Sequence, residues 1–230
     1  MAELVKMSAY FGVALSLGTF FLGSWMKKKL RWRFLNPLLL SILFTVGFLL
    51  ACGADYDSYN EGAKYLSYLL TPATVCLAVP LYEQFEVLKK HWRAVLAGIL
   101  SGVAASLLSI LAMAMLFSLE HEEYVTFLPK SITTAIGMGV SQELGGYVPV
   151  TVAVIIITGV LGNVLAEPVL GLFRIREPVA KGIALGTASH AMGTARAMEM
   201  GEVEGAMSSL SIVVAGIVTV VGASVFAMFW

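Results

Sequence analysis

The chain has 230 residues, of which 58% are hydrophobic and 13% are charged, and its formal net charge at pH 7 is zero. Soluble domains carry about 25% charged residues, so this composition excludes an ordinary soluble domain and indicates a membrane protein. A net charge of zero identifies no polyanionic partner, and we expect no binding to nucleic acid.

Long stretches without any charged residue recur along the chain. In a helix, about 20 apolar residues cross the roughly 30 Å hydrocarbon core of a bilayer. Six stretches predict long membrane helices: residues 7–26, 34–54, 65–82, 94–119, 149–166 and 205–230. Two shorter segments, at 127–147 and 182–204, bring the total to about eight membrane segments. We therefore expect an all-α polytopic membrane protein in which some of these segments are broken or re-entrant.

The basic residues gather in three clusters, at 27–33, 89–93 and 174–181. Loops rich in Lys and Arg stay in the cytoplasm, so these clusters are predicted to lie inside and the N-terminus outside. The first apolar stretch lacks a small-x-small cleavage site and is followed directly by a basic cluster. We therefore do not expect a cleaved signal peptide.

Residues 127–147 are predicted to enter and leave the membrane on the same side. If this segment crossed, the next helix would place the cluster at 174–181 outside, against the charge rule. Pro129 and the Gly145-Gly146 pair delimit roughly 16 helical residues, which would span only about 24 Å. We predict a re-entrant or broken segment here; the alternative is a short, tilted span.

Two further segments are short or interrupted. The uncharged run at 182–195 contains His190, and Pro72 and Pro80 interrupt residues 65–88. Transporters place discontinuous helices of this kind at their binding sites.

The whole chain is expected to form a single transmembrane domain over residues 1–230. It would consist of a first half, 1–126, and a second half, 127–230, that carries most of the polar motifs. A shift of 57 residues aligns Pro72 with Pro129 and Glu86 with Glu143. Such weak alignments leave open an internal, inverted repeat.

The stretch "GTASHAMGTARAMEMGEVEG", residues 186–205, is unusually polar for this chain. On a regular helix, one face would carry Ser189, Gly193 and Arg196. A neighbouring face would carry Thr187, His190 and Thr194. A charge at membrane depth costs at least about 2.5 kcal/mol on insertion scales. Arg196 is therefore expected to contact an anionic substrate or, alternatively, to pair with Glu199 or reach a headgroup.

His190 is consistent with two roles. It could relay a proton or donate to a carboxylate, or it could be a neutral residue bonded to a neighbouring helix. Glu199, Glu202 and Glu204 are read as a solvated loop rather than as proton carriers. Among them Glu202 is the candidate for proton coupling, because Gly201 and Gly205 lie on either side of it.

The segment "LPKSITTAIGMGVSQELGG", residues 128–146, places hydroxyl groups and a lysine near a predicted helix start. Lys130 and Thr134 would lie one helical turn apart, next to Ser131 and Thr133. Helix N-termini present free N–H groups and positive potential that suit a carboxylate. Alternatively, the hydroxyl groups only satisfy backbone groups within the bundle.

Other polar and small residues indicate helix packing. Asn163 and Glu167 lie on an otherwise apolar helix and are expected to bond between helices. Two pairs of glycines at small-xxx-small spacing permit close helix contact: Gly98 with Gly102, and Gly182 with Gly186.

No enzyme motif of the HExxH, GxSxG or P-loop type occurs, and we expect no enzyme. Ser189 and His190 are adjacent and would point in different directions on a helix. Cys52 and Cys76 lie in apolar stretches and are read as packing residues. We expect no metal site and no cofactor.

Four segments resemble the LrgB/CidB family. In chain order they are "NPLLL" at 36–40, "YLLTPATVCLAVPLYEQFEVLKK" at 68–90, "LPKSITTAIGMGVSQELGG" at 128–146 and "LGTASHAMGTARAMEMGEVEGA" at 185–206. The resemblance covers roughly residues 34–230 and is specific, because four separate motifs occur in order.

Bacterial members of that family are described as holin-like or antiholin-like proteins that influence murein hydrolase export and autolysis. A small LrgA/CidA-type membrane protein is their usual partner. Plant relatives, in which both parts are fused, move glycolate and glycerate across the plastid envelope, and other bacterial systems are linked to pyruvate uptake. The resemblance covers only the LrgB/CidB part of these fused proteins, so we expect this chain to differ from the fused plant pattern.

The resemblance implies a transporter of small 2-hydroxy or 2-oxo monocarboxylates, such as glycolate, glycerate, pyruvate or lactate, that spans the inner (plasma) membrane several times. The alternative it implies is a holin-like or antiholin-like regulator that acts with an LrgA/CidA-type partner. A homodimer is a further expectation from the family.

Residues and resemblance together predict a site for a small carboxylate anion near the membrane midplane. Segments 127–147 and 182–204 would meet there, with 71–82 nearby, and this block would move against the other helices for alternating access. Lys130 and Arg196 would offset the substrate's charge, and Gly193 would allow close approach. Hydrogen bonds would come from Ser131, Thr133, Thr134, Thr187, Ser189 and Thr194. His190 and Glu202 are the candidates for proton coupling.

Overall fold

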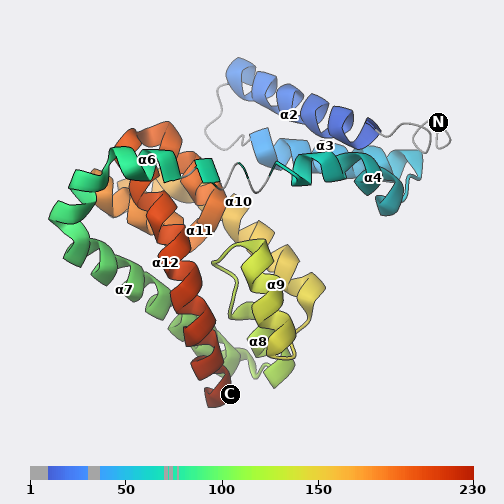
Figure 1. Ribbon diagram of the computed structural model, residues 1–230. Coiled ribbons are helices and arrows are strands. Elements are labelled where there is room, and N and C mark those ends of the chain that lie inside the picture. The colour runs from blue at the N-terminus through green and yellow to red at the C-terminus, as the bar shows by residue number, and fades with distance from the viewer. Residues whose placement is uncertain (1–9, 31–36, 70–71, 73–74, 77) are drawn as a thin grey trace. The chain divides into compact units, whose positions relative to one another are not determined.

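The computed structural model describes residues 10–30, 37–69, 72, 75–76 and 78–230. All regular elements among these residues are helices, which confirms the expected all-α architecture (Figure 1). The chain divides into two compact units, an N-terminal unit over Met1–Cys76 and a C-terminal unit over Leu77–Trp230.

Three helices of the N-terminal unit lie wholly within the described residues. They are α2 (Phe11–Leu30), α3 (Pro37–Cys52) and α4 (Tyr56–Ser67). Helix α2 packs on both others, and Thr19 joins it to α3 through hydroxyl contacts of 3.0 Å to Ser41 and to Thr45. Helix α4 begins after Asp55, whose carboxylate accepts a hydrogen bond from the Ser58 backbone N–H at 3.1 Å. Such an N-cap satisfies one of the free N–H groups of a helix start.

The C-terminal unit holds the remaining described helices. In chain order they are α6 (Ala78–Glu83), α7 (Phe85–Phe117), α8 (His121–Phe127), α9 (Thr134–Glu143), α10 (Val148–Leu172), α11 (Pro178–Met200), α12 (Glu202–Phe226) and the 3₁₀ turn η1 (Ala227–Phe229). Among the described helices, α7, α10 and the α12–η1 stretch are long and apolar enough to cross a membrane. They correspond to three of the six predicted long spans.

The other three predicted spans do not form long, apolar helices among the described residues. Helix α2 has 20 residues but carries Lys27, Lys28 and Lys29 in its last turn. Helix α3 is apolar but has 16 residues, which reach only about 24 Å. The stretch at 65–82 is divided between the end of α4 and α6, and part of it (70–71, 73–74 and 77) lies outside the described residues. Proline, which disfavours a helix interior, occurs twice in that stretch.

The segment that runs from the end of α8 through α9 to the start of α10, here called the α8–α9 hairpin, turns back on itself, and its two ends are tied together. Thr151 at the start of α10 donates to the carbonyl of Thr126 at 2.9 Å and to Ser141 at 2.7 Å. The backbone N–H of Tyr147 donates to the hydroxyl of Thr126 at 2.7 Å. The chain therefore enters and leaves this hairpin at the same end of the C-terminal unit. The predicted break within residues 127–147 is confirmed. The expected helix start at Pro129 is wrong, because Pro129 lies in the turn and α9 begins only at Thr134 and has 10 residues.

The tip of this hairpin reaches the middle of α7. Ser131 lies between α8 and α9, and its hydroxyl is 3.2 Å from that of Ser106 in α7. Ser106 precedes the end of α7 at Phe117 by 11 residues, or about 16 Å of helix. A hydrocarbon core is about 30 Å thick, so this distance from the end of α7 corresponds to about half of such a core.

Helix α11 is interrupted at its centre, which confirms the expected break in the segment at 182–204. Ser189 and His190 have non-helical backbone angles, and His190 has a φ of 41°. The helix ends at Gly201, after which α12 begins directly. A residue other than glycine at such a φ is uncommon, and it persists only where its surroundings hold it.

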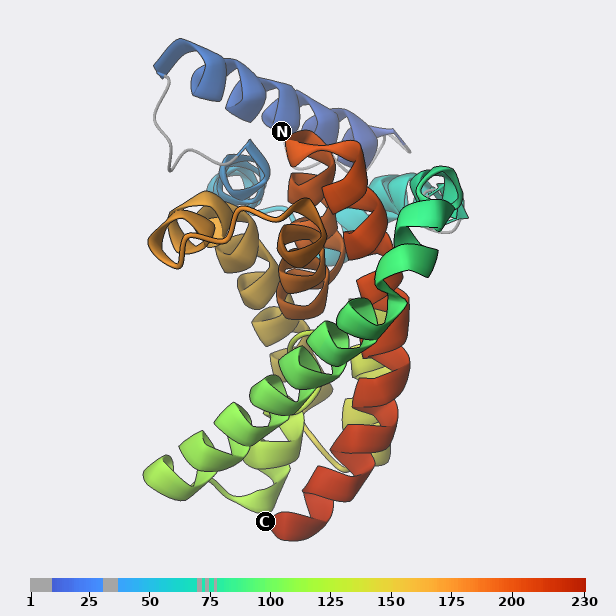
Figure 2. The ribbon, with the colours of Figure 1, turned by 90° about the vertical axis from the view of Figure 1, so that its left-hand side faces the viewer.

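Small residues let α11 approach α12 closely, as the glycine spacing predicts. A Cβ added at Gly182 would meet the backbone of Glu204, and one added at Gly186 would meet the backbone of Ser208. The apolar core of the C-terminal unit lies where these two helices meet α7 and α8. At one end of the unit the chain terminus lies beside α8, where the indole of Trp230 donates to the carbonyl of Leu119 at 2.7 Å (Figure 2).

Candidate functional site

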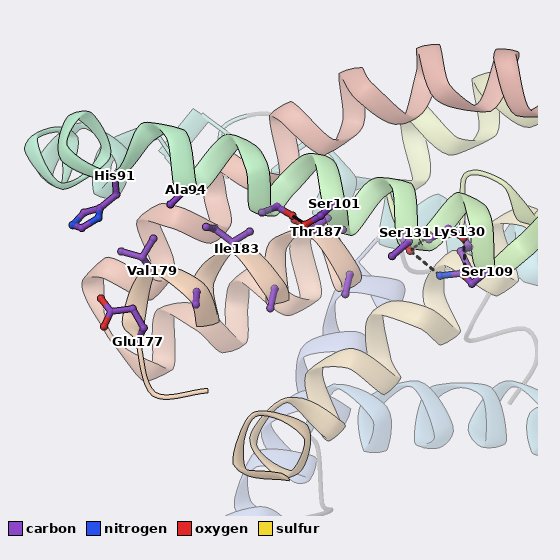
Figure 3. A pocket seen from close by; sticks show the side chains of 17 residues that line it. His91, Ala94, Ser101, Ser109, Lys130, Ser131, Glu177, Val179, Ile183 and Thr187 are labelled. Atoms are coloured by element: carbon purple, nitrogen blue, oxygen red, sulfur yellow. Dashed lines mark hydrogen bonds between the residues drawn. The ribbon is translucent and has the colours of Figure 1, made fainter. Parts of the chain in front are cut away.

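A cavity of about 900 Å³ lies between α7, the tip of the α8–α9 hairpin and the first half of α11 (Figure 3). Its lining residues are His91, Ala94, Gly98, Ser101, Gly102, Ala105, Ser106, Ser109, Lys130, Ser131, Glu177, Val179, Ala180, Ile183, Ala184, Thr187 and Ala188. Three residues predicted to bind a substrate, Lys130, Ser131 and Thr187, are thus brought together from segments that are far apart in sequence.

Helix α7 supplies one whole wall of the cavity through a stripe of small side chains. These residues recur every three or four positions from Ala94 to Ser109, the spacing of one helix face. From His91 to Ser109 the wall extends about 27 Å at 1.5 Å per residue, close to the thickness of a hydrocarbon core. Our sequence reading missed this face, although its spacing of Gly, Ala and Ser was visible.

Lys130 supplies a positive charge at one end of the cavity. Its ammonium group donates to the hydroxyl of Ser131 at 2.9 Å, and Ser131 in turn contacts Ser106. No carboxylate among the described residues lies within ion-pairing distance of this ammonium. A charge held among helices without an opposite charge is costly, so the arrangement favours an anion as its partner.

Thr187 lines the middle of the cavity and is 6% exposed. Its hydroxyl is a buried polar group without a hydrogen-bond partner among the described residues. Buried polar groups are nearly always bonded, and each exception calls for an explanation such as a missing water or ligand. The hydroxyl of Thr187 is therefore a buried polar group beside this cavity whose hydrogen bond the described residues do not supply.

The other end of the cavity carries His91, from the start of α7, and Glu177, which precedes α11 (Figure 3). Neither residue was among those predicted from the sequence. Figure 3 shows them at the end opposite Lys130 and Ser131, with Thr187 between. The cavity is therefore polar at both ends, and the acidic group lies far from the ammonium.

A second group of predicted residues lies buried inside the bundle rather than in the cavity. Nε2 of His190 is 3.1 Å from the carbonyl of Ile155 in α10, which matches the alternative of a histidine bonded to a neighbouring helix. The hydroxyl of Thr194 donates to the carbonyl of His190 at 3.1 Å and lies 2.7 Å from that of Ser208 in α12. These bonds hold the interruption of α11 in place.

Glycines and an asparagine complete this group. The carbonyl of Leu185 occupies the space that a Cβ at Gly193 would fill. The group that approaches Gly193 closely is therefore the backbone of α11 itself. Ser189 packs against Gly162 of α10. Asn163 donates to the carbonyl of Met192 at 2.8 Å, which confirms its expected role in bonding two helices.

Arg196 lies past the interruption and does not line the cavity. Its guanidinium donates to the carboxylates of Glu167 in α10 and Glu199 in its own helix. The expected helix-to-helix bond of Glu167 is confirmed, and the pairing of Arg196 with Glu199 is the alternative named above. Whether Arg196 also contacts a substrate stays a prediction.

The remaining candidates are more dispersed. Thr133 and Thr134 are half-buried at the start of α9, just beyond the cavity, and Glu202 is exposed at the start of α12. Glu204, read as part of a solvated loop, is instead 7% exposed and lies 3.7 Å from the ammonium of Lys181. No described residue of α6 lines the cavity.

Comparison with known proteins agrees with these motifs. A family model described as the LrgB-like family matches residues 16–229. The chain is 38% identical over 221 residues to the antiholin-like protein LrgB of Bacillus subtilis (strain 168), and the match covers 96% of each chain. No solved structure matches the chain. The family model spans nearly all of the chain, and the fold contains helices of membrane length. The chain therefore belongs to the LrgB-like family of membrane proteins.

Proposed function

We propose that the protein transports small 2-hydroxy or 2-oxo monocarboxylates, of the size of glycolate, glycerate, pyruvate or lactate, across the plasma membrane. One observation carries the proposal: the ammonium of Lys130 and the buried hydroxyl of Thr187 line the same cavity, and among the residues that the structure describes the first has no ion pair and the second no hydrogen-bond partner. A carboxylate would complement the ammonium, and a 2-hydroxy or 2-oxo group would complement hydroxyl groups along the wall.

The charge balance favours a single carboxylate. One uncompensated cation offsets one negative charge, whereas a second carboxylate would lie unpaired among small apolar residues or near Glu177. The cavity volume of about 900 Å³ is within the range of small-molecule sites and exceeds what a three-carbon acid fills. Water would therefore accompany the substrate.

The cavity also offers a path. Its wall on α7 runs about the thickness of a hydrocarbon core, with different polar groups at the two ends. We propose that the hairpin at 127–147 and the broken helix at 182–204 move against the other helices to open one end at a time. We also propose that the chain is divided into two halves at residue 126. His190 or Glu202 would couple a proton to transport, and two copies of the chain would form a homodimer.

The test is uptake of labelled glycolate and pyruvate into proteoliposomes that contain the purified chain. We expect saturable uptake that is lost in Lys130→Met and partly kept in Lys130→Arg, because arginine preserves the charge. Lys90→Met is the matched control, since Lys90 is exposed and does not line the cavity. Normal uptake with an unchanged KM in Lys130→Met would refute the site.

The name of the B. subtilis relative supports a second candidate function, an antiholin-like regulator that acts with an LrgA/CidA-type membrane protein. This function predicts no uptake by the isolated chain. Uptake restored by an added LrgA-type protein would indicate one part of a two-part transporter. No uptake in either case, together with leakage of large dyes, would favour the holin-like function.

A further inference from the structure

A second, smaller cavity of about 550 Å³ lies at the end of α10, where the chain turns into α11. It is lined by Glu167, Leu170, Gly171, Arg174, Ile175, Arg176, Lys181 and Met200. None of these residues lines the cavity beside Lys130, so a ligand in this second cavity is independent of the transport proposal.

The charges in this second cavity do not balance. The carboxylate of Glu167 is bonded to Arg196, and the ammonium of Lys181 lies beside Glu204. Arg174 and Arg176 form no ion pair with any residue that the structure describes. Two guanidinium groups therefore remain without an anion at one small opening.

The backbone at Arg174 is unusual for an arginine. The N–H of Arg174 bonds to the carbonyl of Gly171, and the N–H of Ile175 bonds to the carbonyl of Leu170. This pair of bonds is the Schellman motif that closes many helices, and its left-handed position usually holds glycine. Arg174 occupies that position with a φ of 55°. Nothing in the hydrogen bonding of the turn requires an arginine side chain there, and strained positions of this kind often serve a function.

The position of the cavity indicates the kind of ligand. Helix α10 is one of the membrane-length helices, so its last residue, Leu172, lies near a membrane surface. Leu172 and Phe173 are exposed apolar side chains directly before the two arginines. A cationic opening next to exposed apolar side chains suits a molecule with an anionic head and apolar tails. The charge pattern of the sequence predicts that this surface is cytoplasmic, where anionic lipids are abundant.

We propose that this cavity binds the phosphate of an anionic phospholipid headgroup, with Arg174 and Arg176 as its ligands. Guanidinium groups donate to phosphate oxygens in a bidentate manner, which a single ammonium cannot do. The acyl chains would lie along Leu172 and Phe173, beside α10. Inorganic phosphate shares the headgroup chemistry but lacks the tails, so the two ligands can be told apart.

The experiment uses the purified full-length chain in a neutral detergent, with its melting temperature followed as lipid is added. Phosphatidylglycerol is the anionic probe, phosphatidylcholine the neutral one, and inorganic phosphate the soluble one. We expect phosphatidylglycerol to raise the melting temperature saturably and the other two to have little effect. In Arg176→Gln the half-saturating concentration should rise by tenfold or more, and Arg93→Gln, which alters an exposed arginine outside the cavity, should behave as wild type.

Arg174→Gly separates ligand binding from folding. Glycine is the preferred residue at the left-handed position, so this variant should melt no lower than wild type without lipid. It should nevertheless lose most of its response to phosphatidylglycerol. A normal lipid response in Arg174→Gly combined with Arg176→Gln would overturn the proposal. An equal response to phosphatidylcholine, or a full response to inorganic phosphate alone, would overturn it as well.

Discussion

Gly102 in α7 lies directly opposite Thr187 in α11, so close that a Cβ added at Gly102 would be 2.7 Å from Cγ2 of Thr187. One turn earlier, Gly98 faces Ile183 in the same way, at 3.1 Å. The two helices that form the long walls of the main cavity therefore meet through glycines. The small-xxx-small spacing seen in the sequence sets the width of the cavity.

Replacing Gly102 by alanine should therefore disturb the cavity. The added methyl group must displace Thr187 or separate the helices, and overpacking of this kind costs about 1–3 kcal/mol. We expect a lower melting temperature and reduced carboxylate uptake. Gly139→Ala is the control, because a Cβ there meets nothing within 4 Å and alanine favours the helix by up to about 1 kcal/mol. Equal behaviour of the two variants would contradict the close contact.

Thr187→Val should separate function from stability. The change removes a buried hydroxyl that has no partner in the described part of the chain, so the variant should melt no lower than wild type. If that hydroxyl donates to a bound carboxylate, its loss should raise KM about tenfold or more. Melting in detergent and uptake in proteoliposomes are the two measurements.

Thr194→Val is the matched comparison. Its hydroxyl bonds to His190 and Ser208, and the loss of those bonds should destabilise the protein by about 1–3 kcal/mol. If Thr187→Val melts lower than Thr194→Val, the hydroxyl of Thr187 has a structural partner and our assignment is wrong.

These two threonines also illustrate how far the sequence could predict the site. The sequence placed both on one face of a regular helix, seven residues apart, and it indicated a short or broken segment at 182–204 without locating the break between them. The interruption at Ser189 and His190 directs Thr187 toward α7 and Thr194 toward α12. Neither residue type signals a break, because the unusual backbone at His190 is held by its bond to Ile155 and by other tertiary contacts.

The parts that could be predicted depend on local rules. The hairpin at 127–147 followed from its length, its proline and its glycines, and the glycine pairs predicted helix crossings. The partners of charged residues could not be predicted in the same way. Glu204 resembled a loop residue until the fold placed Lys181 beside it, and Arg196 had several candidate partners. Ion pairs between helices depend on how the helices assemble, which local spacing does not encode.

The ion pair between Arg196 and Glu167 should link α10 to α11 by a measurable but small amount. The two side chains are 20% and 49% exposed. For such partly exposed pairs we expect a coupling free energy of about 0.2–1 kcal/mol from a double-mutant cycle of Arg196→Gln and Glu167→Gln. The exposed Lys89–Glu86 pair, within a single helix turn, is the control and should couple more weakly.

Uptake by Arg196→Gln tests the role that the sequence predicts for this residue. If Arg196 contacts the substrate, KM should rise by far more than the small loss of stability explains. An unchanged KM would remove Arg196 from the binding site and leave Lys130 as the cation that meets the carboxylate. The same preparation with Glu167→Gln controls for loss of the ion pair alone.

The hydrogen bond between Tyr147 and Glu122 at the open end of the hairpin should make that closure sensitive to high pH. The phenol donates to the carboxylate at 2.6 Å, and this bond, with the negative charge of Glu122, raises the pKa of Tyr147 above its ordinary value of 10.0. Because the folded state holds this proton more tightly, the contribution to stability is fully present below about pH 10. It should be lost as the pH rises through the raised pKa.

NMR titration of tyrosines labelled at Cζ would measure this pKa, with Tyr147→Phe to assign the signal. Glu122→Ala removes both the acceptor and the charge, so it should move the pKa of Tyr147 back toward 10.0. The stability advantage of wild type over Glu122→Ala should shrink above pH 10 and should be absent when Tyr147 is phenylalanine. A pKa of Tyr147 that is unaffected by Glu122→Ala would show that the bond does not close the hairpin in solution.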